Sequence, residues 1–103
     1  MTYEFDAELW IWDARKVDSW TFVDLPPDVA DDVLELAGPF TRGFGSVRVE
    51  VAVGGTVWRT SIFPSKAKRT YVLPIKKAVR QAEQLAPGDT ARVRIELVDV
   101  TPR

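Results

Sequence analysis

Residues 42–63 read RGFGSVRVEVAVGGTVWRTSIF, and the interpretation of the whole chain starts from them. Two runs of alternating residues flank Gly54 and Gly55. Two glycines between strands favour a type I′ hairpin turn, which needs positive φ at both positions. With a two-residue loop, Val53 pairs with Thr56. Period-two alternation then separates an apolar face, expected in the core, from a polar face to be examined for function.

The register assigns every hairpin residue to one of these faces. The expected core face consists of Val47, Val49, Val51, Val53, Trp58, Thr60 and Ile62. The opposite face carries Ser46, Arg48, Glu50, Ala52, Val57, Arg59, Ser61 and Phe63.

Strands and two helices are expected on either side of the hairpin. Alternation predicts further strands at residues 3–12, 19–25, 69–73 and 90–100. Prolines and helical spacing predict helices at about 26–37 and 74–85. Residues 64–68 are expected to form a polar connection, and Trp20 and Phe22 to be the inward pair of their strand.

The sequence therefore predicts a mainly β fold. We expect one domain, residues 1–103, forming a small closed barrel of about six strands with two short helices at its ends or openings. The predicted core is Phe5, Leu9, Phe22, Val47, Val49, Val51, Trp58, Ile62, Val79, Leu85, Val93 and Ile95.

Composition excludes several kinds of chemistry. The 103 residues include no cysteine and no histidine, so disulfides, thiol nucleophiles, imidazole bases and the usual zinc or haem ligands are absent. We expect no cofactor and no metal. No apolar run approaches the roughly 20 residues of a membrane helix, and the acidic N-terminus does not resemble a signal peptide. A cytoplasmic protein is expected.

Charge is unevenly distributed along the chain. Residues 1–38 contain ten acidic and two basic residues, whereas residues 39–103 contain twelve basic and five acidic residues. The two halves can attract each other within one domain, or the second half can present a basic surface to an anionic partner.

Two groups of basic residues are candidates for anion binding. On the polar face of the hairpin, arginine side chains offer forked donors that suit carboxylates and phosphates, although Glu50 opposite Arg59 can neutralise one of them. At the start of the second helix, bases occupy the positive end of the helix dipole, where they are unfavourable unless they bind an anion or are simply solvated. The candidate ligand-binding residues are Arg42, Ser46, Arg48, Arg59, Ser61, Lys76, Lys77 and Arg80.

Trp10 and Trp12 are candidates for a protein interface. Alternation places them opposite Phe5, Leu9 and Ile11, so they either face water or are covered by the first helix or the last strand. If they face water, weak self-association through this surface is expected.

Catalysis and nucleic-acid binding have less support. Ser46, Ser61 and Ser65 lack a histidine to activate them, which leaves only a serine–lysine pairing, so no catalytic residue is assigned. Trp58, Phe63 and Tyr71 near basic residues could stack on bases, but the isoelectric point of about 5.4 and the acidic first half argue against a nucleic acid.

The motifs RGFGSV, WRTSIFPS and LPIKKAVR at residues 42–47, 58–65 and 73–80 resemble the bacterial family DUF1905, a domain of unknown function. The similarity extends to Phe5, to residues 20–26 and to the turn at residues 87–89. The resemblance implies a double-split barrel, a fold also used by small bacterial transcription-factor modules, and no established activity. We therefore expect a non-catalytic binding module for a small anionic ligand or an acidic partner. The alternatives are a self-associating interaction domain and a nucleic-acid-binding barrel.

Overall fold

A computed structural model describes residues 2–12, 20–38 and 45–98 of the chain. The strands are β1 (Thr2–Glu8), β2 (Trp10–Trp12), β3 (Trp20–Asp24), β4 (Val47–Val53), β5 (Thr56–Ser65), β6 (Thr70–Pro74) and β7 (Thr90–Leu97). The helices are α1 (Pro27–Ala37) and α2 (Lys77–Ala82).

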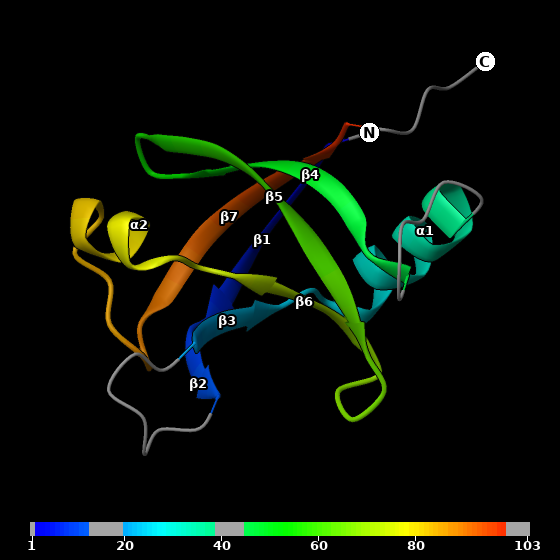
Figure 1. Cartoon of the computed structure of the whole chain (residues 1–103), viewed down its shortest axis with the longest axis horizontal. Helices are drawn as coiled ribbons and strands as arrows, with labels where there is room; N and C mark the ends of the chain where they lie inside the picture. The colour runs from blue at the N-terminus through cyan, green and yellow to red at the C-terminus, as the bar shows by residue number, and fades with distance from the viewer. Residues whose placement is uncertain (1, 13–19, 39–44, 99–103) are drawn as a thin grey trace.

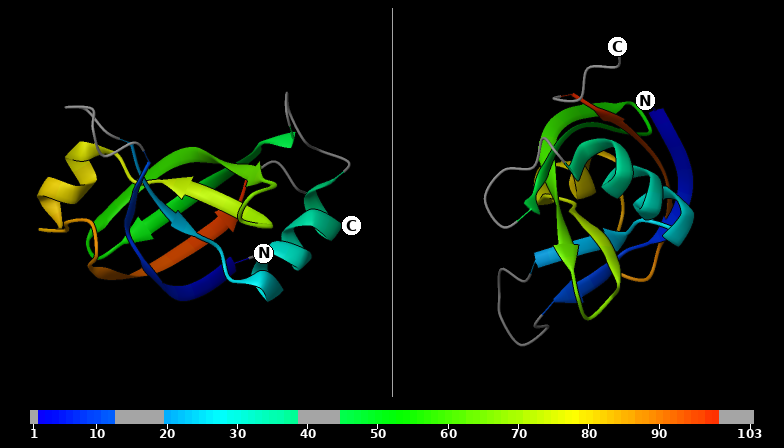
Figure 2. Two further views of the ribbon diagram at one scale, coloured as in Figure 1. Left: turned by 90° about the horizontal axis from the view of Figure 1, so that it is seen from below. Right: turned by 90° about the vertical axis from the view of Figure 1, so that its right-hand side faces the viewer.

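The strands form one antiparallel sheet in the order β1-β7-β4-β5-β6-β3-β2, curled into a half-barrel. The two helices lie at opposite ends of this sheet (Figures 1 and 2). The predicted mainly β class with two short helices is confirmed, although the described residues form seven strands and the sheet is not fully closed.

The central hairpin has the predicted register, with Val53 opposite Thr56 and Arg59 opposite Glu50. Its turn differs from the prediction in one respect. Of the two turn glycines, only Gly54 has a positive φ, of 56°. This is the sign pattern of a type II′ turn, which needs glycine only at the first central position.

Strands β1 and β2 occupy opposite edges of the sheet although only Leu9 separates them in the chain. Residues 3–12 were expected to form one strand. Instead, Leu9 is buried, its amide donates to the Asp89 carbonyl, and its carbonyl accepts from the Gly88 amide. The turn before β7 thus takes up the hydrogen bonds of Leu9 and lets the chain pass from one sheet edge to the other.

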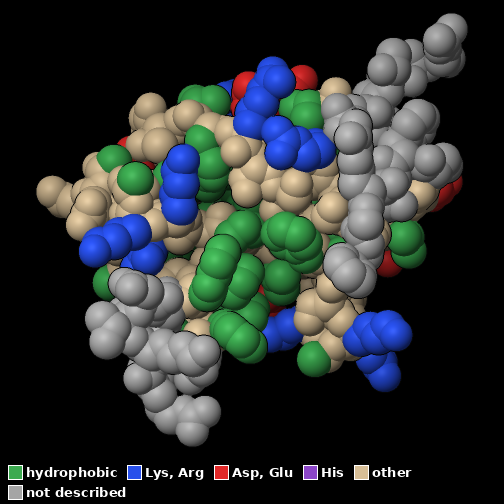
Figure 3. Space-filling model, in the orientation of Figure 1, with side chains coloured by type: hydrophobic (Ala, Val, Ile, Leu, Met, Phe, Trp, Pro, Cys, Tyr) green, Lys and Arg blue, Asp and Glu red, His purple; other side chains and the backbone are tan. Residues whose placement is uncertain are grey.

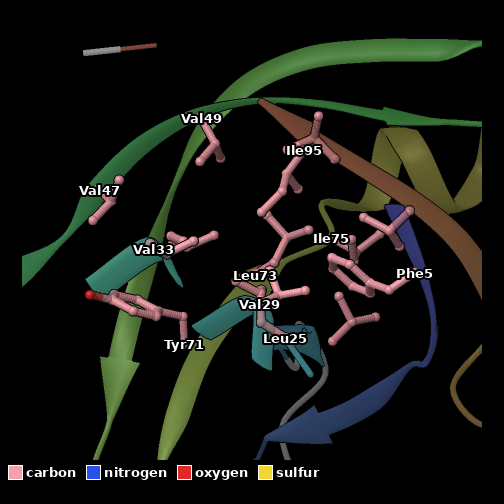
Figure 4. Close-up of a cluster of buried hydrophobic side chains, with 14 of the residues drawn as sticks. Phe5, Leu25, Val29, Val33, Val47, Val49, Tyr71, Leu73, Ile75 and Ile95 are labelled. Atoms are coloured by element: carbon pink, nitrogen blue, oxygen red, sulfur yellow. The ribbon is translucent and has the colours of Figure 1, made fainter. Parts of the chain in front are cut away.

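The core fills the inside of the curled sheet and is closed by α1 (Figure 4). Alternate valines of β4 and alternate residues of β7 point inward, as predicted. The buried cluster also contains Val29, Val33 and Ile75, whose three- and four-residue spacing predicts burial, and six residues that were not expected there: Val23, Leu25, Ala30, Ala37, Tyr71 and Leu73.

Three predicted core residues are only partly buried: Phe22, Trp58 and Leu85. The prediction assigned Phe22 and Trp20 to the wrong side of β3. Thr21 and Val23 are the buried residues of this strand, whereas Trp20 is 61% exposed. Val23 pairs with the buried Leu73 of β6, which sets the inward side of β3. The large side chains of Trp20 and Phe22 therefore lie on the outside of the sheet.

The segment after β5 also differs from the prediction. Strand β5 continues through Pro64 to Ser65, where a polar connection was expected. Pro74 ends β6 rather than starting a helix, because the Ile75 amide donates to the Thr21 carbonyl at 2.8 Å and prolongs the pairing with β3. Helix α2 is consequently short.

Candidate functional site

The outer surface of the sheet brings together residues from strands β5, β6, β3 and β2. On β5, Arg59, Ser61 and Phe63 alternate with inward residues and share the outer side. Phe63 lies opposite Val72 of β6, and Pro74 of the same strand lies opposite Phe22 of β3. The outer side continues to β2, where Trp10 pairs with Phe22 and Trp12 pairs with Trp20.

Five aromatic side chains gather on this outer surface, and we call them the aromatic face: Trp10, Trp12, Trp20, Phe22 and Phe63. Together with Pro64, Ser65 and Val72 they line a shallow hollow of about 490 Å³. In Figure 3, hydrophobic side chains gather in the middle of the molecular surface, with Lys and Arg side chains around them and acidic side chains mainly at the margins.

Three of these rings form a stacked row. The Phe22 ring centre is 5.2 Å from that of Trp10 at an interplanar angle of 29°, and 6.2 Å from that of Trp20 at 17°. Offset stacking at these distances is favourable and restrains the rings. Trp20 at one end of the row, together with Trp12 beside it, remains more than half exposed.

Trp10, at the other end of the row, is held by polar contacts. Its indole Nε1 donates to Asp24 Oδ1 at 2.8 Å, and Asp24 Oδ2 lies 3.4 Å from Lys68 Nζ. The same ammonium lies 4.3 Å from the centre of the Trp10 ring, which is a cation–π contact. Trp10 is therefore partly covered by the Lys68 side chain of the β5–β6 turn.

These contacts predict the effect of removing the Asp24 carboxylate. We expect Asp24→Ala to lower the free energy of unfolding by about 1–2 kcal/mol, because it leaves the partly buried indole N–H of Trp10 without its acceptor. The indole resonance of Trp10 in an amide NMR spectrum should shift at the same time. Chemical denaturation measures the stability change.

Glu35→Ala is the matched control, since Glu35 is an exposed acid on α1. It should change the free energy of unfolding by less than about 0.5 kcal/mol. Equal losses in the two variants would show that the Asp24 contacts do not restrain Trp10.

The candidate hairpin residues lie on the same outer surface as the aromatic face. Arg48 is exposed opposite Ser61, and Arg59 Nε is 3.4 Å from Glu50 Oε1. Ser61 precedes Phe63 by two residues, a separation of about 7 Å along a strand. The structure thus joins two groups that the sequence treated as separate, the hairpin arginines and the tryptophans.

The remaining candidate residues lie apart from this surface or outside the described residues. Lys76 and Lys77 are exposed at the start of α2, at one end of the half-barrel. Arg80 is half-buried, and its Nε donates to the Ile75 carbonyl at 3.2 Å, which holds its guanidinium against the chain. Ser46 is half-buried immediately before β4, and Arg42 lies outside the described residues.

The turn between β5 and β6 contributes basic residues that are not among the predicted ligand-binding residues. Lys66, Lys68 and Arg69 lie in this turn, and the Lys68 amide donates to Ser65 Oγ at 3.3 Å.

The orientation of β3 could have been predicted from the residue that follows it. Alternation counted backwards from the apolar Leu25 places Asp24, Phe22 and Trp20 together on the side of β3 opposite the core. The sequence carried this signal, but the size of the aromatic side chains outweighed it in the prediction.

Within the described part of the chain, no three His, Cys, Asp or Glu side chains are grouped so that they could hold a metal ion. The helices of that part are also too short or too polar to cross a membrane.

A curled antiparallel sheet of seven strands with two short helices defines a small, mainly β half-barrel domain in the described residues. The chain belongs to the family described as "Domain of unknown function (DUF1905)", whose model matches residues 5–95. No curated protein matches the sequence.

Proposed function

We propose that this domain is a non-catalytic binding module that holds a small anionic ligand or an acidic partner on its outer sheet surface. The observation that carries the proposal is the aromatic face. Its rings are accessible to solvent at Trp12 and Trp20, and stacking and the Trp10–Asp24 hydrogen bond restrain the row of rings. Exposed apolar patches bordered by polar residues mark interaction sites in soluble proteins. A chain without cysteine suits a reducing compartment, and we propose that it works in the bacterial cytoplasm.

The bases around the aromatic face supply the charge for this role. Arg48, Arg59 and Ser61 lie at its β4–β5 side, and the turn containing Lys66 and Lys68 lies at its β5–β6 end. Glu50 pairs with Arg59 and Asp24 pairs with Lys68, so the donors that remain for an anion are mainly those of Arg48 and Lys66. Aromatic residues and arginine are the side chains enriched at binding interfaces.

Lys76, Lys77 and Arg80 form a second, smaller candidate site at α2. We assign them a lesser role in this proposal because they lie apart from the aromatic face, and the same holds for Ser46, which is half-buried before β4, while Arg42 lies outside the described residues.

Arg59→Ala tests the charge contribution. We expect it to weaken binding of phosphate or of an acidic peptide by about fivefold or more, because one charge-assisted contact is lost. The free energy of unfolding should fall by no more than about 1 kcal/mol, since the Arg59–Glu50 pair is exposed. Amide NMR titration measures binding, and chemical denaturation measures stability.

Arg92→Ala is a closely matched control. Arg92 is 62% exposed and lies 3.4 Å from Asp6, whereas Arg59 is 63% exposed and lies 3.4 Å from Glu50. Arg92 belongs to the β1–β7 side of the sheet. If the two variants weaken binding equally, or if no anion shifts amides of residues 45–65 in the wild type, the proposed function is wrong.

Self-association through the aromatic face is a second candidate function, favoured by the exposure of Trp12 and Trp20. A two-fold symmetric contact would bring the bases around the face of one copy toward those of the other. Any such dimer is therefore expected to be weak and to strengthen with salt. Analytical ultracentrifugation at high protein concentration tests it, and a monomer at all concentrations would exclude it.

A further inference from the structure

We propose that the partner of the aromatic face is a single-stranded nucleic acid. Its nucleobases stack on the exposed rings, and its phosphates contact the surrounding Lys and Arg side chains. This inference rests on the proposed function and names the chemical class of its partner.

The ring geometry favours flat ligands. Trp10, Phe22 and Trp20 form a row of nearly parallel rings, and Trp20 at its open end is 61% exposed. A nucleobase can extend such a row by stacking on Trp20, or stack beside it on Trp12. Stacking of this kind tolerates any base sequence, because every base has an aromatic surface. A simple phosphate or carboxylate would leave these rings without a role.

The positions of the cationic side chains suit a flexible polyanion. Lys66 and Arg69 lie in the β5–β6 turn beyond Phe63, and Arg59 lies four residues before Phe63 on the same strand. A four-residue separation corresponds to about 13 Å along β5. Cations therefore flank the rings on two sides, and a strand of about four nucleotides that crosses the face would meet both groups.

The acidic character of the whole chain does not extend to this surface. Of the two acids in it, Glu50 pairs with Arg59, while Asp24 binds both Trp10 and Lys68. On the β1–β7 side, Asp6 pairs with Arg92. At the margin of this surface, Glu8 of β1 lines a hollow with Lys68 and Arg69, and Asp31 of α1 lines another with Lys66 and Arg69. These two acids lower the positive potential at the β5–β6 turn, whereas Arg48 and Arg59 of the hairpin belong to neither lining.

The structure favours a single strand over a duplex. In a duplex the bases are already stacked on one another, so the exposed rings would have nothing to bind. The described helices also offer no recognition helix for a major groove: α2 has six residues, and α1 carries exposed acids.

The direct test is binding of a fluorescein-labelled oligothymidylate of about ten nucleotides, followed by anisotropy and by quenching of tryptophan fluorescence. We expect Trp20→Ala to weaken binding about tenfold or more, through loss of one stacking position. Trp20→Phe is the matched control, because it keeps an aromatic ring on which a base can stack. It should retain most of the affinity.

The salt dependence gives a second readout. The logarithm of the association constant should fall with the logarithm of salt concentration, with a slope of about −0.7 for each phosphate neutralised. Lys66→Ala should make this slope less steep by about 0.7, the value for one phosphate contact. Trp20→Ala should lower the affinity and leave the slope unchanged. If Lys66 and Trp20 only stabilised the fold, the two substitutions would not change the salt slope and the affinity separately.

Two comparison ligands distinguish this inference from the proposed function. If an acidic peptide of similar length shifts amides of the aromatic face and the oligonucleotide does not, the nucleic-acid inference is overturned and the binding-module proposal stands. If neither ligand shifts them, both fail. The second comparison ligand is a duplex of the same length. The inference would also be overturned if Trp20→Ala bound the oligonucleotide as tightly as the wild type does, or if the duplex bound more tightly than the single strand.

Discussion

Leu73→Ala is expected to lower the free energy of unfolding by about 3–5 kcal/mol, close to the upper end of what one core truncation costs. Leu73 is completely buried in the middle of β6, opposite Val23 of β3. Figure 4 shows it among the buried side chains of the core. Since β6 is hydrogen-bonded on both sides, the surrounding backbone cannot easily collapse into the cavity.

Leu34→Ala serves as the control for Leu73→Ala. Leu34 is exposed on α1, and alanine has the higher helix propensity, so the free energy of unfolding should change by less than about 0.5 kcal/mol. Urea denaturation of both variants measures the difference. Similar losses at the two positions would mean that the inward side of β6 has been assigned incorrectly.

Gly54→Ala is expected to lower the free energy of unfolding by about 2–3 kcal/mol. Gly54 has a φ of 56°, which an alanine adopts only with strain. A Cβ at this position would also collide with the Glu83 carboxylate. That carboxylate accepts a hydrogen bond from Thr56 Oγ1 at 2.7 Å, so the substitution displaces the contact that ties the hairpin turn to the end of α2.

Gly55→Ala is the matched control, one residue further along the same turn. Its Cβ would meet nothing within 4 Å, and Gly55 does not have a positive φ. We expect a change of no more than about 0.5 kcal/mol. Thermal or chemical unfolding of the two variants tests the assigned turn, because a true type I′ turn would make both substitutions costly.

The alternation in β4, β5 and β7 predicted the hairpin register and most of the core, because local repeats of two residues are visible in the sequence. The same approach misplaced Trp20 and Phe22. Which side of β3 faces inward is decided by its pairing with β6, where Val23 meets the buried Leu73. Alternation counted from Leu25 indicates the same side, but the large aromatic side chains favoured the opposite assignment.

The candidate site was predictable in its parts and not as a whole. The sequence singled out Arg48, Arg59, Trp10 and Trp12, and it offered no reason to connect them. Their connection depends on the strand order β4-β5-β6-β3-β2, which places Ser61 and Phe63 of β5 between the arginines and the tryptophans.

The sequence by itself determined the mainly β class, the central hairpin and its register, and the absence of histidine and cysteine chemistry, because these depend on residue type and short-range spacing. Only the tertiary structure decided that the chain changes sheet edge at Leu9 and that five aromatic rings share one exposed surface. Both follow from the curling of the sheet, which buries one side of the strands other than β2 and leaves the largest side chains of β2 and β3 outside. Long-range strand pairing, and not side-chain size, selected the residues that face water.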